Sequence, residues 1–267
     1  MNTAIASELQ ALWKLRNLLW VLTKRDLQSR NTGSIAGVLW LYIPPILTVA
    51  LYYLVFDVVF SMRLGEKAPV RSVGIYLITG MLPWMAFCDA IARSMNSIND
   101  ASQLLQKNPL PATLFPAKSV ASSAIVYGPI LLLVSAAYAP INHYSGAAVV
   151  LFPLFAFQIL LSWGLGYIFA LIAVAVRDLL ALVGFLLSIG VFISPILFPI
   201  ELFPAEWRWV LWINPMTPLI TAYQSILLSG DFPALNSWIA LMAWFTAIFL
   251  FLSTVIERSR EHLVDWL

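Results

Sequence analysis

Residues 118–177 read KSVASSAIVYGPILLLVSAAYAPINHYSGAAVVLFPLFAFQILLSWGLGYIFALIAVAVR, and no Asp, Glu, Lys or Arg occurs between the first residue and the last. A bilayer core about 30 Å thick needs about 20 apolar residues for each helical crossing. The stretch is therefore long enough for two crossings, with the chain turning at PINHYSG (140–146). A soluble core has no need of an uncharged run this long, so the sequence predicts an all-α integral membrane protein.

The composition of the 267-residue chain agrees with this interpretation. Hydrophobic residues make up 61% of the chain and charged residues 10%, whereas about a quarter of a soluble domain is charged. The single cysteine, Cys88, excludes an intrachain disulfide and a thiolate metal cluster. We expect one transmembrane domain over residues 1–267, in which function depends on what the protein moves or anchors.

The uncharged intervals predict six transmembrane spans, at 31–60, 73–93, 118–139, 147–176, 179–200 and 237–257. An even number of spans places both ends of the chain on one side of the membrane. Of the fifteen Lys and Arg residues, eleven then lie in the segments on that side and four on the other. Because cytoplasmic segments carry the excess of Lys and Arg, we expect both termini in the cytoplasm.

The first thirty residues contain scattered charges and no uninterrupted apolar region, so they do not have the pattern of a secretory signal. Five of their leucines share one arc of a helix: Leu12, Leu15, Leu18, Leu19 and Leu22. This pattern favours an amphipathic helix over 1–30 that lies on the membrane surface, with Trp13 and Trp20 at the interface. The alternative is an ordinary cytosolic helix that packs on the protein.

The interval from Arg208 to Asp231 is also uncharged, but Asn214-Pro215 and Thr217-Pro218 interrupt it. Proline removes a backbone donor and disfavours helix at the preceding residue. We therefore expect an extracytoplasmic pair of short re-entrant helices over 201–230, between spans five and six. The alternative is a kinked seventh span that would place the C-terminus outside; the basic residues at 258 and 260 argue against it.

The sequence lacks the residues that an enzyme or an ion-coupled carrier needs. The two histidines, His143 and His262, are predicted on opposite sides of the membrane, and no nucleophile elbow or phosphate-cradling glycine loop is present. The charged residues near the spans are all at span ends and none is at a midplane, where coupling ions are usually bound. The chain is therefore predicted not to be an enzyme, and active transport would take its energy from another polypeptide.

The longest cytoplasmic segment, residues 94–117, is where such a polypeptide would act. Asn99 or Asp100 is placed to cap a short helix that continues through Lys107, and Pro109 and Pro111 would end it. A short helix parallel to the membrane is a suitable lever for a soluble motor domain. A plain connecting loop fits these residues equally well.

Six short blocks carry a family resemblance, in the order LTKRDLQSR (22–30), GSIAGVLWLYIPP (33–45), GMLPW (80–84), AVRD (175–178), SPILFP (194–199) and INPMTP (213–218). With these blocks the chain resembles the ABC-2 type permeases, the membrane subunits of ABC exporters for O-antigen, teichoic acid, capsule-type and related lipid-linked polysaccharides. It departs from the pattern at Asn31-Thr32, where the family often has a basic or aromatic residue.

The resemblance implies a homodimer in a bacterial cytoplasmic (inner) membrane, with two copies of a separate ATPase below it. That ATPase would bind ATP and magnesium, so no cofactor, metal or nucleic acid is expected in this chain. The resemblance also implies a coupling helix in the 94–117 loop, with contacts from Asn99, Asp100, Gln103, Leu104 and Lys107. It implies an outer gate in 201–230, for which the candidates are Trp207, Trp209, Asn214 and Pro215.

Aromatic side chains suit a path for sugar polymers, because sugars present C–H faces as well as hydroxyl groups. The candidate channel-lining residues are Tyr42, Tyr53, Phe56 and Phe60 on span one and Phe185 and Phe192 on span five. Packing or lipid contact is the alternative role for these rings. For a pyrophosphate-linked lipid head we expect a cytoplasmic entrance at Arg25, Arg30, Arg177 and Asp178, because guanidinium groups bind phosphate in a bidentate manner. The alternative is an arginine that extends to the interface and pairs locally.

The predicted function is therefore ATP-driven export of a lipid-linked polysaccharide. Two alternatives remain open from the sequence. The first is an ABC-2 permease for a small drug, lipid or haem-like cargo. The second is a scaffold subunit of a membrane complex that transports nothing.

Overall fold

The computed structural model describes residues 3–30, 37–64, 72–108, 110–142, 146–176 and 178–259, and regular structure in these ranges is helical. The four helices that are long and apolar enough to cross a membrane are α4 (Val73–Ser97), α6 (Leu114–Asn142), α7 (Leu151–Ala175) extended by the turn η3 (Gly146–Val150), and α11 (Leu235–Ser259). They correspond to the predicted spans two, three, four and six. The predicted total of six full-length crossings is not reproduced by the described helices.

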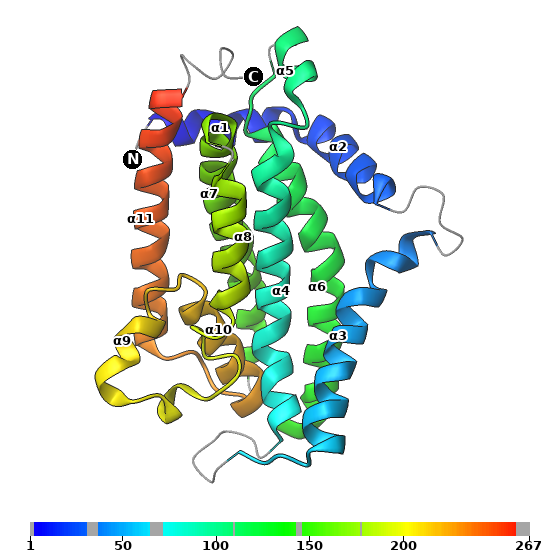
Figure 1. Ribbon diagram of the computed structural model, residues 1–267, viewed down its shortest axis with the longest axis vertical. Helices are drawn as coiled ribbons and strands as arrows, with labels where there is room; N and C mark the ends of the chain where they lie inside the picture. The colour runs from blue at the N-terminus through cyan, green and yellow to red at the C-terminus, as the bar shows by residue number, and fades with distance from the viewer. Residues whose placement is uncertain are drawn as a thin grey trace.

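The helix α4 lies at the centre of the molecule, between α6 and α7, and α11 packs on the far side of α7 (Figure 1). Small residues bring these helices together: a Cβ at Gly166 of α7 would lie 2.7 Å from Ser94 Cβ, and one at Gly164 would lie 3.0 Å from Ile248. Close approach at small residues is how helices associate in lipid, where the hydrophobic effect does not drive them together.

A buried polar chain also links the core helices. Gln158 of α7 donates from its side-chain nitrogen to the carbonyl oxygen of Pro83 in α4 at 2.8 Å, and its side-chain oxygen accepts from the Tyr223 hydroxyl at 3.0 Å. Gln158 and Tyr223 are 3% and 0% exposed. Such hydrogen bonds between helices hold a bundle together in a medium without water.

The first predicted span, 31–60, is shorter and more irregular than expected. It consists of the 3-10 turn η1 (Gly37–Leu41), α3 (Ile43–Tyr53) and the π-helical turn η2 (Leu54–Val59), and residues 31–36 lie outside the described ranges. The 17 helical residues after η1 (11 and 6) extend about 26 Å. Pro44 and Pro45 sit in the first turn of α3, where their missing N–H groups cost nothing.

The predicted fifth span, 179–200, is wrong as a continuous helix. Helix α8 (Leu179–Gly190) has 12 residues and is about 18 Å long, roughly half of a bilayer crossing. It ends beside the middle of α4, because a Cβ at Gly190 would lie 2.5 Å from the Trp84 ring. Residues 191–199 continue as turns. Pro195 and Pro199 explain the interruption, since neither can donate a helical hydrogen bond.

The N-terminal segment forms two helices, not the single one predicted: α1 (Thr3–Lys14) and α2 (Arg16–Ser29), which lie across one end of the bundle (Figure 1). The predicted apolar arc packs against the core through Leu12, Leu15, Leu18 and Leu19. Trp13 and Trp20 are 72% and 61% exposed. The segment therefore packs on the protein and presents its tryptophans outward.

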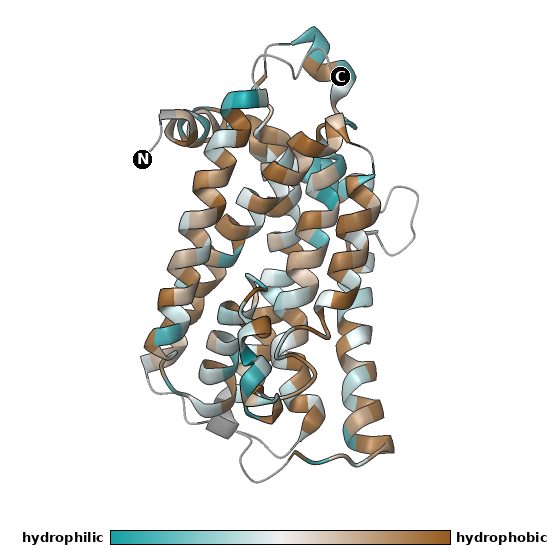
Figure 2. Cartoon of the chain, turned by 60° about the vertical axis from the view of Figure 1, so that its left-hand side comes forward, coloured by the Kyte–Doolittle hydropathy of each residue, from teal (hydrophilic) through white to brown (hydrophobic). Residues whose placement is uncertain are grey.

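The short helix α5 (Ser102–Lys107) lies at the same end as α1 and the last turn of α11 (Figure 1). The other half of the bundle holds η4 (Ile200–Leu202), η5 (Ala205–Trp207), α9 (Arg208–Leu211), α10 (Thr217–Gln224) and η6 (Ser225–Ser229). Of these, α10 packs against α4, α7 and α11. Figure 2 shows apolar residues along the long helices and most of the strongly hydrophilic ones near the two ends.

Candidate functional site

The irregular segment 191–199 is held in place by side chains from α4 and α10. The Tyr76 hydroxyl lies 2.9 Å from the carbonyl oxygen of Pro195 and 3.0 Å from that of Phe198, and the Gln224 amide donates to the same Pro195 oxygen at 2.7 Å. Tyr76 and Gln224 are 2% and 8% exposed. Each buried carbonyl left without a partner would cost about 1–3 kcal/mol. These contacts make a non-helical backbone tolerable beside α4.

A second set of hydrogen bonds joins the end of α8 to the segment before α10. The Ser194 hydroxyl donates to the carbonyl of Gly190 at 2.6 Å and accepts from the Asn214 amide at 2.6 Å. The Asn214 side-chain oxygen accepts from the N–H of Met216 at 2.9 Å. Asn214, a predicted gate residue, therefore connects the interrupted crossing to the region over 201–230. Ser194, its partner, and Tyr76 and Gln224, which hold residues 195 and 198, were not predicted as site residues.

The other predicted gate residues contribute no side-chain hydrogen bond to this connection. Trp207 and Trp209 are 57% and 59% exposed, and Pro215 is half-buried. The segment that carries them consists of short turns and the four-residue helix α9. A gating role for these three residues stays a prediction.

The predicted channel-lining residues do not all face the same way. Phe185 and Phe192 on and after α8 are 62% and 63% exposed, and Phe60 is 62% exposed. The side chain of Tyr42, in contrast, is half-buried, and its hydroxyl donates to the carbonyl of Ile125 in α6 at 3.4 Å.

The ring of Phe56 stacks on that of Tyr52, with centroids 6.1 Å apart, while Tyr53 is 46% exposed. The π-helical turn η2 carries Phe56, and its extra residue per turn rotates the face that an α-helical spacing predicts. The structure therefore offers exposed rings on α3 and α8, not two unbroken stripes.

The predicted entrance residue Arg30 belongs to a network of charges between α2, α4 and α6. Its guanidinium lies 3.0 Å from the carboxylate of Asp26 and 3.6 Å from that of Asp89. Asp89 also pairs with Arg93 at 2.8 Å and accepts a short hydrogen bond from Ser123, and Lys118 lies 4.0 Å from Asp26. The side chain of Arg30 is only 9% exposed.

The remaining entrance candidates are not part of this network. Arg25 and Asp178 are exposed and form none of the ion pairs found among the described residues, and Arg177 lies outside those residues. The charged group formed by Asp26, Asp89, Arg93 and Lys118 was not predicted from the sequence. The four-residue spacing of the Asp26–Arg30 and Asp89–Arg93 pairs was the available signal, because side chains at i and i+4 meet on a helix.

Two cavities flank the charge network. One of about 340 Å³ is lined by residues of α2, α4 and α6 that include Asp26, Arg93 and Lys118. The other, of about 280 Å³, lies on the side of α3 and is lined by Arg30, Trp40 and Tyr127 among others. The guanidinium of Arg30 is already paired with two carboxylates, and through Asp89 it attaches the end of α2 to α4.

The predicted coupling residues lie on and before α5. Asp100, Gln103, Leu104 and Lys107 are exposed and Asn99 is half-buried. The predicted cap is wrong: α5 begins at Ser102 with Ala101 in the capping position, and no side chain caps it. Helix α4 continues to Ser97, and Asn99 and Asp100 lie in the turn that follows it. The helix ends at Lys107 as predicted.

Comparison with known proteins places this arrangement in a family. The family model described as ABC-2 type transporter matches residues 17–228, most of the chain. The chain belongs to the ABC-2 type transporter family. It is 30% identical over 260 residues to the O-antigen export system permease protein RfbA of Myxococcus xanthus, which covers 95% of this chain and 96% of the relative.

Two further relatives are similar over nearly their whole length. The O-antigen export system permease protein RfbA of Klebsiella pneumoniae is 26% identical, with 92% of this chain and 91% of the relative covered. The polysialic acid transport protein KpsM of Escherichia coli is 24% identical, with 89% of this chain and 91% of the relative covered. This ABC-2 type chain is accordingly a multi-pass membrane protein.

Proposed function

We propose that this chain is the membrane-spanning subunit of an ABC exporter that moves a lipid-linked polysaccharide across the cytoplasmic membrane. In this proposal two copies form the path, and two copies of a separate ATPase supply the energy. The observation that carries the proposal is the similarity, over about nine tenths of the chain or more, to relatives named for O-antigen export and polysialic acid transport. The chain itself contributes no catalytic group.

The interrupted crossing supports a path next to α8. Non-helical backbone at membrane depth is tolerated only where protein covers it or where it lines a water-filled cavity. The turns at 191–199 begin beside Trp84, in the middle of α4, and Phe192 and Ile193 are exposed there. A second copy that covers this face would enclose a path between the two protomers, with the aromatic rings of α3 and α8 along it.

The exposed face of α3 supports the same arrangement. In this chain α3 packs chiefly on α4, and Leu47 and Leu51 of α3 are 61% and 59% exposed, as is Val58 of η2 at 62%. An apolar helix that packs on so little of its own protomer is well suited to contact another subunit. We place both termini and α5 on the cytoplasmic side, where Leu104 would contact the ATPase, and the segment 201–230 on the outer side.

A deletion strain tests the proposed function. Removal of the gene from its host is expected to leave the polysaccharide inside the inner membrane, and a plasmid copy of the full chain is expected to restore it to the surface. Polymer that reaches the surface normally in the deletion strain would contradict the proposal. If the deletion changes only sensitivity to small toxic compounds, the chain is a permease for a small cargo.

A further inference from the structure

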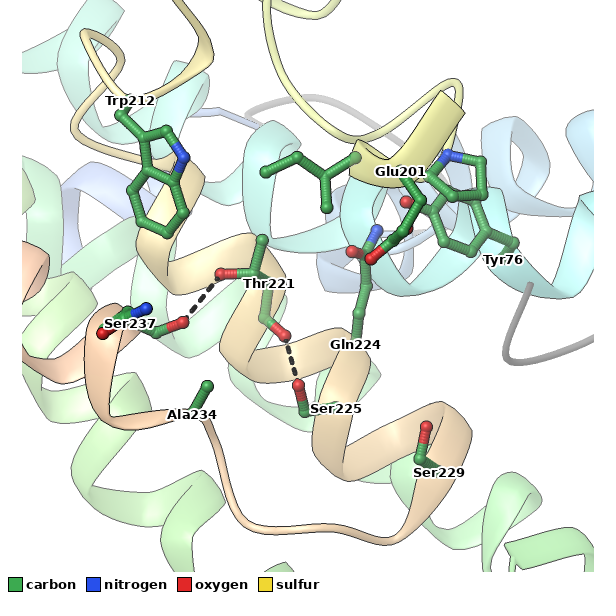
Figure 3. Close-up of a pocket in the computed structure, with 12 residues that line it drawn as sticks. Tyr76, Glu201, Trp212, Thr221, Gln224, Ser225, Ser229, Ala234 and Ser237 are labelled. Carbon is green, nitrogen blue, oxygen red and sulfur yellow. Dashed lines mark hydrogen bonds between the residues drawn. The ribbon is translucent and has the colours of Figure 1, made fainter. Parts of the chain in front are cut away.

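A polar pocket of about 590 Å³ opens in the half of the molecule that carries α10, within a single protomer (Figure 3). Its volume lies within the range of about 300–1,000 Å³ that is typical of small-molecule sites. The polar or aromatic side chains that line it are Tyr76, Glu201, Trp212, Thr221, Gln224, Ser225, Ser229, Asn236 and Ser237. They come from α4, η4, the turn after α9, α10, η6 and α11.

Three of the lining hydroxyl groups, on Tyr76, Thr221 and Ser225, have backbone carbonyls as acceptors. Those of Thr221 and Ser225 donate to backbone carbonyls of α10 at 3.1 and 2.9 Å, and that of Tyr76 donates to the carbonyls of 195 and 198. These oxygens can still accept hydrogen bonds, and that of Thr221 also lies 3.3 Å from the Ser237 hydroxyl. The carboxylate of Glu201 is a further acceptor and forms no ion pair among the described residues. The pocket consequently favours a ligand that brings several O–H or N–H donors.

An aromatic wall completes the pocket. The Trp212 ring stands on one side of the pocket and Tyr76 with Glu201 on the other (Figure 3). The backbone of Trp212 is fixed by α11, because its carbonyl accepts from the indole N–H of Trp244 at 3.1 Å. An aromatic face is a partner for the slightly positive C–H groups of a saturated ring, since it carries partial negative charge.

We propose that this pocket binds one neutral or amino-sugar residue of the exported chain, which stacks on Trp212 and donates its hydroxyl hydrogens to Glu201 and the lining oxygens. The inference rests on the proposed function and adds to it a sugar-binding site within each protomer, apart from the path between the copies. A phosphate or an acidic sugar does not suit the pocket, because its negative charge would meet the carboxylate of Glu201 and a row of acceptor oxygens.

The test is saturation-transfer NMR on the full chain with its ATPase in lipid nanodiscs. The probes are short oligosaccharides released by mild acid from the host's own surface polysaccharide. We expect saturation transfer to the sugar protons, which Trp212→Ala reduces by about tenfold through loss of the stacking face. Glu201→Gln is expected to weaken binding by about threefold, because hydrogen bonds to a charged acceptor are the stronger ones.

Glu206→Gln is the matched control, since Glu206 is an exposed glutamate of the same segment that does not line the pocket. It is expected to bind like the wild type. Glu201→Gln and Trp212→Phe keep the test decisive if Trp212→Ala does not fold. No saturation transfer with the wild type, equal transfer in all variants, or displacement by inorganic phosphate would overturn the inference.

The deletion strain separates the two proposals. Polymer trapped inside that strain, together with no sugar at the pocket, overturns the sugar site and leaves the exporter in place. Polymer that reaches the surface normally overturns the proposed function itself.

Discussion

The helices α7 and α8 are both strongly apolar, yet they are packed very differently. Leu161 and Leu171 of α7 are 1% and 2% exposed, whereas Leu182 and Phe185 of α8 are 54% and 62% exposed. The difference follows the small residues along each helix: Gly166 within α7 sits against Ser94 of α4, whereas nothing lies within 4 Å of a Cβ at Gly184 within α8, which approaches α4 closely only at its last residue, Gly190. Apolar composition therefore allows a helix to insert into the membrane, whereas close packing against its neighbours determines whether the helix belongs to the tightly packed core.

The largest effect is expected from a pair of glycine substitutions. Gly166→Leu places a side chain where a Cβ alone would lie 2.7 Å from Ser94 Cβ, so α4 and α7 are forced apart. We expect almost no folded protein, measured as monodisperse yield by gel filtration in detergent. Gly184→Leu should give the wild-type yield. Equal yields of the two variants would contradict the division into core and periphery.

A smaller loss is expected where charges, not packing, attach a peripheral helix. Asp89→Asn removes the ion pair with Arg30 that joins α4 to the end of α2, and should weaken the attachment of α2 by about 2 kcal/mol. Trypsin would then cleave faster after Lys24 and Arg25 on α2.

Added salt should change cleavage of the wild type only a little, because the Arg30 side chain is 9% exposed and partly buried ion pairs are screened much less than exposed ones. The control, Asp231→Asn, changes an exposed carboxylate in the other half of the bundle and should leave the cleavage rate unchanged. An Asp89→Asn rate equal to that of the wild type would show that α2 is held by packing alone.

Substitutions that affect the interrupted crossing, which consists of α8 and the turns at 191–199, should destabilise the protein less than substitutions in the core. Tyr76→Phe removes the donor to the carbonyls of Pro195 and Phe198, but Gln224 still serves the first of them. We expect a loss of about 1–2 kcal/mol, seen as a lower thermal unfolding midpoint in detergent. Gln224→Leu in addition to Tyr76→Phe should cost more than the sum of the single changes, because Pro195 then has no side-chain donor.

The smallest effect on folding is expected on α5. Leu104 is 40% exposed at the end of the bundle, so Leu104→Asp should leave the unfolding midpoint unchanged. It should nevertheless reduce co-purification of the ATPase strongly, since a charge replaces an apolar contact at the predicted interface. Glu206→Lys, an exposed substitution in the other half of the bundle, is the control. Normal co-purification of the Leu104→Asp variant would remove α5 from that interface.

The sequence predicted what depends on long uncharged intervals and could not predict what depends on a few contacts. The helices α4, α6, α7 and α11 follow from intervals long enough to cross a bilayer, and the leucine arc of α1 and α2 follows from helical spacing. The half-length of α8 does not, because Pro195 and Pro199 leave carbonyls without helical donors, and that is tolerated only where Tyr76 and Gln224 are present to bond them.

Some residues of the candidate site were likewise predicted from the sequence and others were missed. Exposed rings such as Phe185 were found from their type and spacing. The partners of Arg30 were missed, since Asp89 lies far from it in sequence and the two meet only when α2 packs on α4. Asn214 was named as a gate candidate from the family resemblance, whereas its bond to Ser194 depends on tertiary structure.

Cross-linking between copies tests most directly whether the loosely packed helices face each other across a path. In a cysteine-free parent made with Cys88→Ser, Phe185→Cys on α8 is compared with Phe251→Cys on α11, which is similarly exposed at 54%. With a short bismaleimide in native membranes, we predict covalent dimers from Phe185→Cys and monomers from Phe251→Cys. Dimers from the α11 position with none from the α8 position would contradict the proposed arrangement.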